Sequence, residues 1–137
     1  LTRTYMLDEP TADFERIWTI ERQAQQAVFD AAKIGAACSS LDDAARAVLV
    51  KHGLGPDYQL PGLPHRAGHG LGLEIHEAPY IGRGNQLPLA AGMCFSNEPM
   101  IVVPGQFGVR LEDHIYMSAE GAQWFTQPAK GPTEPFA

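Results

Sequence analysis

Apolar residues recur every three or four positions between residues 14 and 34. This spacing predicts an amphipathic helix of about twenty residues. Its apolar stripe consists of Ile17, Ile20, Ala24, Ala27, Val28, Ala31 and Ile34. Thr11 or Asp13 can cap the start of this helix, and Gly35 is expected to close its end. The polar face is expected to carry Glu21, Arg22, Gln25 and Gln26.

A second, shorter apolar stripe predicts another helix. It consists of Leu41, Ala44, Ala45, Val48 and Leu49. Ser40 and Asp43 resemble a capping box at its start, and Gly53 is expected to end it. Residues 53–64 contain three Gly and three Pro, so we predict a loop there.

Strand patterns dominate the remainder of the chain. The segment 104–106 reads Pro-Gly-Gln and is expected to join two strands as a hairpin. Helices followed by strands predict an α+β fold, with the helices on one face of an antiparallel sheet. Strands are expected at residues 1–7, 93–103, 107–117 and 123–126, followed by an irregular tail at 128–137.

Composition narrows the function classes. The chain has 137 residues, enough for one domain, and 45% of them are hydrophobic. A formal net charge of -6 argues against binding to nucleic acid or to an anionic membrane surface. No apolar run approaches the roughly 18–20 residues of a membrane span, and no signal peptide is apparent. Cys38 and Cys94 are expected to be reduced thiols. The start at Leu1, without Met, suggests a piece of a longer protein.

A stretch dense in Gly and His begins at His65. His65 and His69, if both lay on one strand, would be about 13 Å apart, too far to bind one metal ion. Gly68, Gly70 and Gly72 remove side chains around His69, so another backbone or a ligand can approach closely. A Gly-rich turn with incidental histidines is the alternative.

Two carboxylates stand out in the strand segments. Glu98 lies inside the apolar stretch 93–103, where a carboxylate must be paired with an arginine or bound to a cation. Along residues 107–117, strand alternation places Arg110, Glu112 and His114 on one face, which is either solvated or lines a site. The opposite face takes Val109, Leu111, Asp113 and Ile115. We expect Asp113 to form structural hydrogen bonds and His114 to lie at the surface or behind the site.

Taken together, His69, Glu98 and Glu112 form a ligand set for a first-row divalent metal, and the carboxylates favour harder ions such as Mn(II). A two-metal site holds its ions about 3.5–4 Å apart and needs more ligands than these three. The additional ligands are expected to be acidic and to lie elsewhere.

Three motifs resemble the pita-bread metallopeptidases, the family of Xaa-Pro aminopeptidases, Xaa-Pro dipeptidases and methionine aminopeptidases. They are the stretch from His65 to Pro79, Asn97-Glu98-Pro99, and Arg110-Leu111-Glu112-Asp113. The His65-Arg66 opening is more similar to the Xaa-Pro branch. The resemblance implies that residues 1–137 are the C-terminal part of a pita-bread catalytic domain. It also implies an N-terminal part with two aspartate ligands, the second directly before the residue that matches Leu1.

The resemblance further implies the roles of individual residues. His69, Glu98 and Glu112 would bind two divalent ions, with Mn(II) expected and Zn(II), Co(II) or Fe(II) as alternatives, and Glu112 would bridge them. Glu98 would also act as general base or proton shuttle for the attacking water. His76 would hydrogen-bond the scissile carbonyl or stabilise the tetrahedral intermediate. His65 would line the substrate pocket, and Arg110 would orient the site.

The implied activity is hydrolysis of an Xaa-Pro peptide bond by a cytoplasmic, homodimeric enzyme acting on a peptide substrate. These 137 residues alone are expected to be inactive. Two alternatives remain: a metal-free amidinohydrolase resembling creatinase, and a non-catalytic binding module on the same fold.

Overall fold

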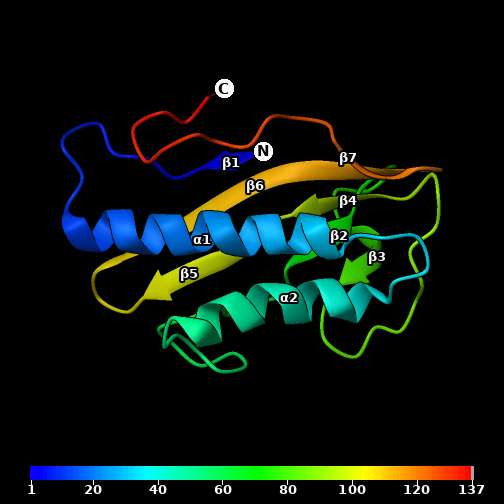
Figure 1. The fold of residues 1–137 in the computed structure, drawn as a ribbon, viewed down its shortest axis with the longest axis horizontal. Helices are drawn as coiled ribbons and strands as arrows, with labels where there is room; N and C mark the ends of the chain where they lie inside the picture. The colour runs from blue at the N-terminus through cyan, green and yellow to red at the C-terminus, as the bar shows by residue number, and fades with distance from the viewer. Residues whose placement is uncertain (137) are drawn as a thin grey trace.

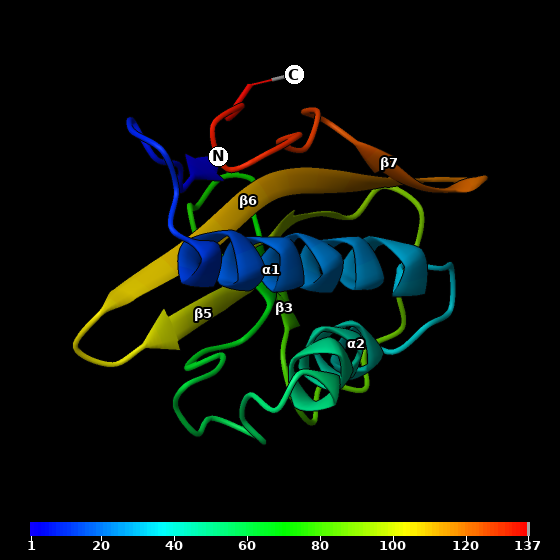
Figure 2. The ribbon, with the colours of Figure 1, turned by 60° about the vertical axis from the view of Figure 1, so that its left-hand side comes forward.

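The computed structural model describes residues 1–136, and its helices and antiparallel strands form two layers. Both helices lie on one face of the sheet (Figure 1, Figure 2), which confirms the predicted α+β class. The helices are α1 (Ala12–Ala31) and α2 (Cys38–Lys51). The strands are β1 (Thr2–Arg3), β2 (Gly68–Gly70), β3 (Glu77–Ile81), β4 (Cys94–Asn97), β5 (Met100–Val103), β6 (Phe107–Ser118) and β7 (Gly121–Trp124).

Strand β6 organises the sheet. It pairs with β1, β4, β5 and β7, and the strand order runs β1-β6-β4-β2-β3. The single strand predicted at 93–103 is wrong, because the chain leaves the sheet at Glu98 and Pro99 and returns as β5. The amide of Glu98 donates to the carbonyl of Ala67 at 2.8 Å, and Pro99 has no N–H to offer β6. The hairpin prediction is confirmed, since Val103 pairs with Phe107.

Helix α1 begins and ends for different reasons. Thr11 caps the start by accepting a hydrogen bond from the amide of Phe14 at 3.3 Å. The predicted extension to Ile34 is wrong, because the helix ends at Ala31 and the Ile34 side chain is 48% exposed. The amide of Gly35 donates instead to Leu89 at 2.8 Å, so a tertiary contact draws the chain out of the helix.

The predicted polar face of α1 is partly wrong. Glu21 and Gln25 are fully buried against the sheet, whereas Arg22 and Gln26 are half-buried. Gln25 finds a buried partner in Asp113, to which its side-chain amide donates at 2.9 Å. Helical periodicity alone could not reveal this, since the partner lies 88 residues further along the chain.

Helix α2 starts earlier than predicted. It begins at Cys38, so Ser40 and Asp43 do not form the expected capping box. No side chain caps it; the amide of Cys38 donates to the carbonyl of Leu87 at 2.9 Å. A backbone carbonyl in the loop before β4 therefore accepts a hydrogen bond that a capping side chain would otherwise accept.

The remaining expectations hold in part. Strand β1 covers two residues rather than the predicted seven, and β7 ends before Phe125. The tail is irregular through residue 136, and Ala137 lies outside the described residues. Cys38 and Cys94 are free thiols, as predicted. Within residues 1–136, no helix combines the length and apolar character required to cross a membrane.

Candidate functional site

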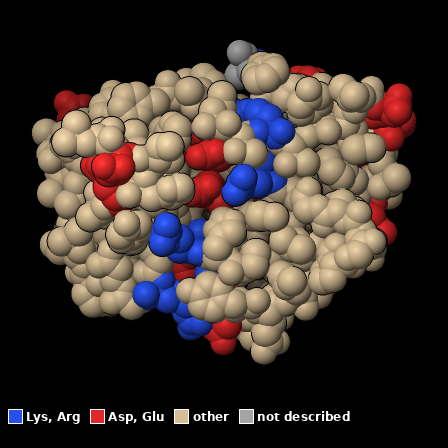
Figure 3. Space-filling model, turned by 180° about the vertical axis from the view of Figure 1, so that it is seen from behind, with Lys and Arg blue, Asp and Glu red and all other residues tan. Residues whose placement is uncertain are grey.

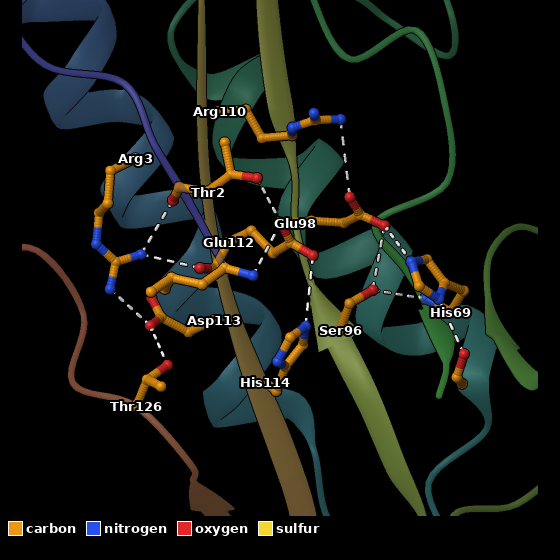
Figure 4. A network of polar contacts seen from close by, with 12 residues as sticks. Thr2, Arg3, His69, Ser96, Glu98, Arg110, Glu112, Asp113, His114 and Thr126 are labelled. Carbon is orange, nitrogen blue, oxygen red and sulfur yellow. Dashed lines mark hydrogen bonds and ion pairs between the residues drawn. The ribbon is translucent and has the colours of Figure 1, made fainter. Parts of the chain in front are cut away.

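Three residues far apart in sequence converge on the face of the sheet opposite the helices. His69 belongs to β2, Glu98 directly follows β4, and Glu112 lies in the middle of β6. One ligand atom from each lies within 4.8 Å of the others. Figure 4 shows their side chains turned toward one another, while Asp113 points the other way. The convergence expected from the sequence is confirmed.

Close packing of β2 between β3 and β4 brings His69 to this point. A Cβ on Gly68 would lie 1.9 Å from the carbonyl oxygen of Ser96, and one on Gly70 would lie 2.3 Å from that of Ala78. Such distances exclude any side chain at either position. The glycines flanking His69 thus permit the close backbone approach that the sequence indicated.

The ring of His69 is oriented by its backbone surroundings. Its Nδ1 lies 2.9 Å from the carbonyl oxygen of Gly70, and its Nε2 lies 2.9 Å from Oε1 of Glu98. A carbonyl can only accept a hydrogen bond, so Nδ1 carries the proton there. Nε2 therefore faces the site and is the nitrogen able to ligate a metal.

Glu98 is held from two sides. The hydroxyl of Ser96 donates to Oε1 at 3.1 Å, and the guanidinium of Arg110 lies 3.8 Å from Oε2. The arginine partner that the sequence left open is thus present, although the Arg110 side chain is 41% exposed. Such a long, exposed ion pair contributes little stability. Glu98 remains free to engage a cation or a proton.

Glu112 is ionised at neutral pH. The hydrogen bond from His114, at 3.4 Å, has the largest effect on the pKa of Glu112, and burial opposes it. The hydroxyl of Thr2 and the positive charges of the Leu1 amino group and His114 add to the lowering, which brings the pKa to about 2. His114 therefore lies beside Glu112 in the lining of the site, half-buried and in contact with its carboxylate. The contact of Thr2 carries no local sequence signal, because it depends on the pairing of β1 with β6.

A groove passes over these residues. Two adjoining hollows of about 700 and 530 Å³ share His69, His76, Glu98 and Arg110 as lining. The ring of His76 lies against that of His69, with centroids 4.2 Å apart. On this face, Figure 3 shows acidic atoms among a band of Lys and Arg side chains. A substrate bound in the groove would therefore contact carboxylates at the centre of the site and positively charged side chains around them.

His65 lines only the larger hollow, together with Tyr58, Arg66 and Arg83. It lies in the loop before β2, so the arrangement of His65 and His69 along one strand does not occur. Ser96 is a residue of this site that the sequence did not predict. Strand alternation places Ser96 on the same face as Glu98, so that signal was available.

The donor set fits a divalent metal ion. One imidazole nitrogen and two carboxylates suit a hard or borderline first-row ion. The carbonyl behind Nδ1 of His69 and the hydroxyl behind Glu98 are the supporting contacts that metal ligands commonly have. Of the six residues predicted for the site, five gather around this centre, and His65 lies further along the groove.

Comparison with known proteins gives consistent matches. The family described as metallopeptidase family M24 matches residues 1–119. An Xaa-Pro dipeptidase of Lactobacillus delbrueckii subsp. lactis is 44% identical over 129 residues, covering 94% of this chain and 34% of the relative. The probable dipeptidase PepE of Mycobacterium tuberculosis is 43% identical over 121 residues, covering 88% and 31%.

Solved structures match as well. The dipeptidase PepE of Mycobacterium ulcerans superposes with a TM-score of 0.88 and 39% identity, covering 98% of this chain and 35% of that one. The prolidase of Pyrococcus furiosus gives a TM-score of 0.84 and 36% identity, covering 91% and 36%. The chain therefore spans about a third of the length of the relatives it matches.

Proposed function

Because the chain belongs to metallopeptidase family M24, we propose that the intact protein hydrolyses Xaa-Pro peptide bonds with a metal-activated water. The family is metal-dependent, and the pita-bread enzymes that the chain matches include prolidases and dipeptidases. The observation that carries the proposal is the convergence of His69, Glu98 and Glu112 within 4.8 Å in a groove.

His69, Glu98 and Glu112 would hold the metal, with Glu112 shared between two ions. Mn(II) is the expected metal, since two of the three donors are carboxylates. When bound, such ions lower the pKa of a water molecule and polarise a substrate carbonyl. Further acidic ligands are needed for a two-ion site, and in this proposal they lie outside these 137 residues.

Glu98 is proposed as the proton acceptor in the reaction. Its Oε1 is already held by Ser96, and Oε2 faces Arg110 at 3.8 Å, so the carboxylate has a fixed direction. A proton taken from the attacking water can be passed to the leaving proline nitrogen. Arg110 touches this carboxylate and is proposed to orient it.

His76 is proposed to hydrogen-bond the scissile carbonyl as negative charge develops on it. It lies in both hollows and beside the ring of His69, within reach of the same bound group. His65 is proposed to contact the substrate further along the groove. Both roles require only hydrogen bonding from an imidazole.

We propose that the 137 residues are the C-terminal part of the catalytic domain and that activity belongs to the intact protein. Three ligands can secure one ion, whereas a bridging water needs two. A cytoplasmic location and a homodimeric assembly, both implied by the family resemblance, remain predictions.

The test is Glu98→Gln in the intact protein, assayed on an Xaa-Pro dipeptide with added Mn(II). The substitution keeps the volume and removes the proton acceptor, so kcat should fall by at least about 100-fold. Glu120→Gln, an exposed change in the turn between β6 and β7, is the matched control. Full activity of Glu98→Gln, or activity that survives a strong chelator, would contradict the proposal.

The same assay separates the alternatives. Creatine hydrolysis that survives the chelator would favour the amidinohydrolase, whereas peptide binding without turnover would favour the binding module. His76→Ala provides a second check, since loss of a hydrogen bond made in the transition state lowers kcat more than it raises KM.

A further inference from the structure

Each glutamate of the candidate metal centre has a buried polar neighbour in the chain. Asn97 precedes Glu98 and Asp113 follows Glu112, and both neighbours are fully buried on the helix side of the sheet. Asn97 and Asp113 also face each other as a register pair between β4 and β6. The two glutamates therefore extend to one side of the sheet, while their chain neighbours Asn97 and Asp113 lie opposite each other on the helix side.

Gln25 of α1 contacts both members of this pair. Its side-chain amide donates to Oδ2 of Asp113 at 2.9 Å, and its backbone carbonyl accepts from the amide of Asn97 at 2.8 Å. Gln25 is itself fully buried. The contacts lie in a low-dielectric core, where loss of one partner leaves a polar group unsatisfied.

The rest of Asp113 is held from the opposite direction. Its Oδ1 accepts hydrogen bonds from Arg3, at 2.7 Å, and from the hydroxyl of Thr126. These groups come from β1 and from the segment after β7, on the far side of β6 from β4 (Figure 4). Gln25 thus holds Asp113 from the helix layer, while Arg3 and Thr126 hold it from the opposite direction.

We propose that Gln25 is a positioning residue for the metal centre. By tying Asn97 and Asp113 to one point on α1, it fixes the spacing and direction of Glu98 and Glu112 on the other face of the sheet. The inference rests on the proposed function, since it concerns the same centre. It adds a residue that lies behind the sheet and touches neither metal nor substrate.

The experiment measures metal binding in the intact protein without substrate. Gln25→Met keeps the volume and removes the donor to Asp113. We expect Mn(II) affinity, measured by calorimetry, to fall roughly tenfold, as for other groups that support metal ligands. The visible spectrum of bound Co(II) should also change, because it reports coordination geometry. Gln23→Met, an exposed change on the same helix, should leave both unchanged.

A second variant reverses the hydrogen bond. In Gln25→Glu with Asp113→Asn, the asparagine amide can donate to the new carboxylate, and the net charge of the pair is conserved. Mn(II) affinity should return to within about threefold of the wild-type value. Recovery by donor reversal is a result that simple core packing would not produce.

The outcomes are distinct. A folded Gln25→Met variant with wild-type Mn(II) affinity and an unchanged Co(II) spectrum overturns the inference alone. If Gln25→Met does not fold, the double variant decides: an affinity within about threefold of the wild-type value supports the role, and any larger loss overturns it. A wild-type protein that binds neither ion refutes the proposed function, and this inference with it.

Discussion

Ser96 donates its hydroxyl hydrogen to Oε1 of Glu98 at 3.1 Å, and the same hydroxyl accepts the backbone amide of His69 at 3.0 Å. One small, fully buried side chain thus links two of the three candidate ligands. Ser96 precedes Glu98 by two residues, and side chains two positions apart along a strand lie on the same face, so strand geometry brings the two groups together.

Ser96→Ala should weaken Mn(II) binding about tenfold, because Glu98 loses the donor that orients it. The free energy of unfolding should fall by about 1 kcal/mol, the usual value of one buried hydrogen bond. Calorimetric titration and urea denaturation measure the two effects. Ser40→Ala, exposed in the first turn of α2, is the control. Lower stability with unchanged metal affinity would show that the hydroxyl serves only the fold.

Gly68→Ala should destabilise the protein by roughly 3 kcal/mol, because β2 and β4 must separate to admit the methyl group. The added Cβ would otherwise sit 1.9 Å from the carbonyl oxygen of Ser96. Gly108→Ala is matched to it: the nearest atom would be the Met100 methyl group at 3.4 Å, so we expect a change within about 0.5 kcal/mol. Urea denaturation compares the pair. Equal stabilities would mean that the strands can adjust freely.

Burial raises the pKa of Glu21 well above its usual value, with the backbone of Leu111 and the charge of Arg110 opposing the effect. Below about pH 4 the carboxyl is protonated in both the folded and unfolded states. As the pH rises, the unfolded chain ionises first, so stability falls until the folded carboxyl ionises too. Glu21→Gln removes this dependence.

The Glu21→Gln variant should therefore be more stable than the wild type at neutral pH, and the difference should shrink toward about pH 4. Chemical denaturation across this range gives the measurement. Glu120→Gln, an exposed change, should show no such trend. A gap that widens as the pH falls would contradict the assignment.

Arg46 of α2 anchors one wall of the larger hollow. Its guanidinium bonds Asp42 at 2.7 Å and donates to the carbonyls of Leu63 at 3.1 Å and His65 at 2.8 Å. Arg46→Lys keeps the charge but loses the planar set of donors. KM should rise by about five- to tenfold, with kcat changed less, because the wall that carries His65 loosens.

Steady-state kinetics on an Xaa-Pro dipeptide check the Arg46→Lys effect. Arg16→Lys, half-exposed on α1, is the control. A fall in kcat with KM unchanged would indicate instead that the disturbance reaches the metal centre.

The sequence predicted the convergence of His69, Glu98 and Glu112 better than it predicted the packing around them. Alternation along 107–117 correctly divided β6 into a buried face and an opposite face, because period-two patterning is a local property, but it left open whether the opposite face is solvated or lines a site. The helical pattern, by contrast, placed Glu21 and Gln25 on the exposed face because they are polar, whereas both are buried. The burial of Gln25 depends on Asp113 and Asn97, which are distant in sequence and close only once the sheet has formed.

The break between β4 and β5 was missed for a related reason. Apolar residues run through 93–103, so the segment reads as one strand. Two features end β4: Pro99, a local signal that an apolar run can mask, and the hydrogen bond from Glu98 to Ala67, a contact between segments that no local pattern encodes. That same departure from the sheet allows Glu98 to turn toward His69.

The four partners of β6 protect different stretches of the strand from local opening. Amide protons in a strand paired on both edges exchange with solvent only when the whole sheet opens, whereas terminal strands open by local fluctuation. Glu112 pairs with Thr2 of the two-residue strand β1, because the pairing of β5 reaches Arg110 and that of β4 starts at Asp113. Local opening of β1 therefore reaches this carboxylate, while the stretches of β6 on either side of it stay paired with β4 and β5.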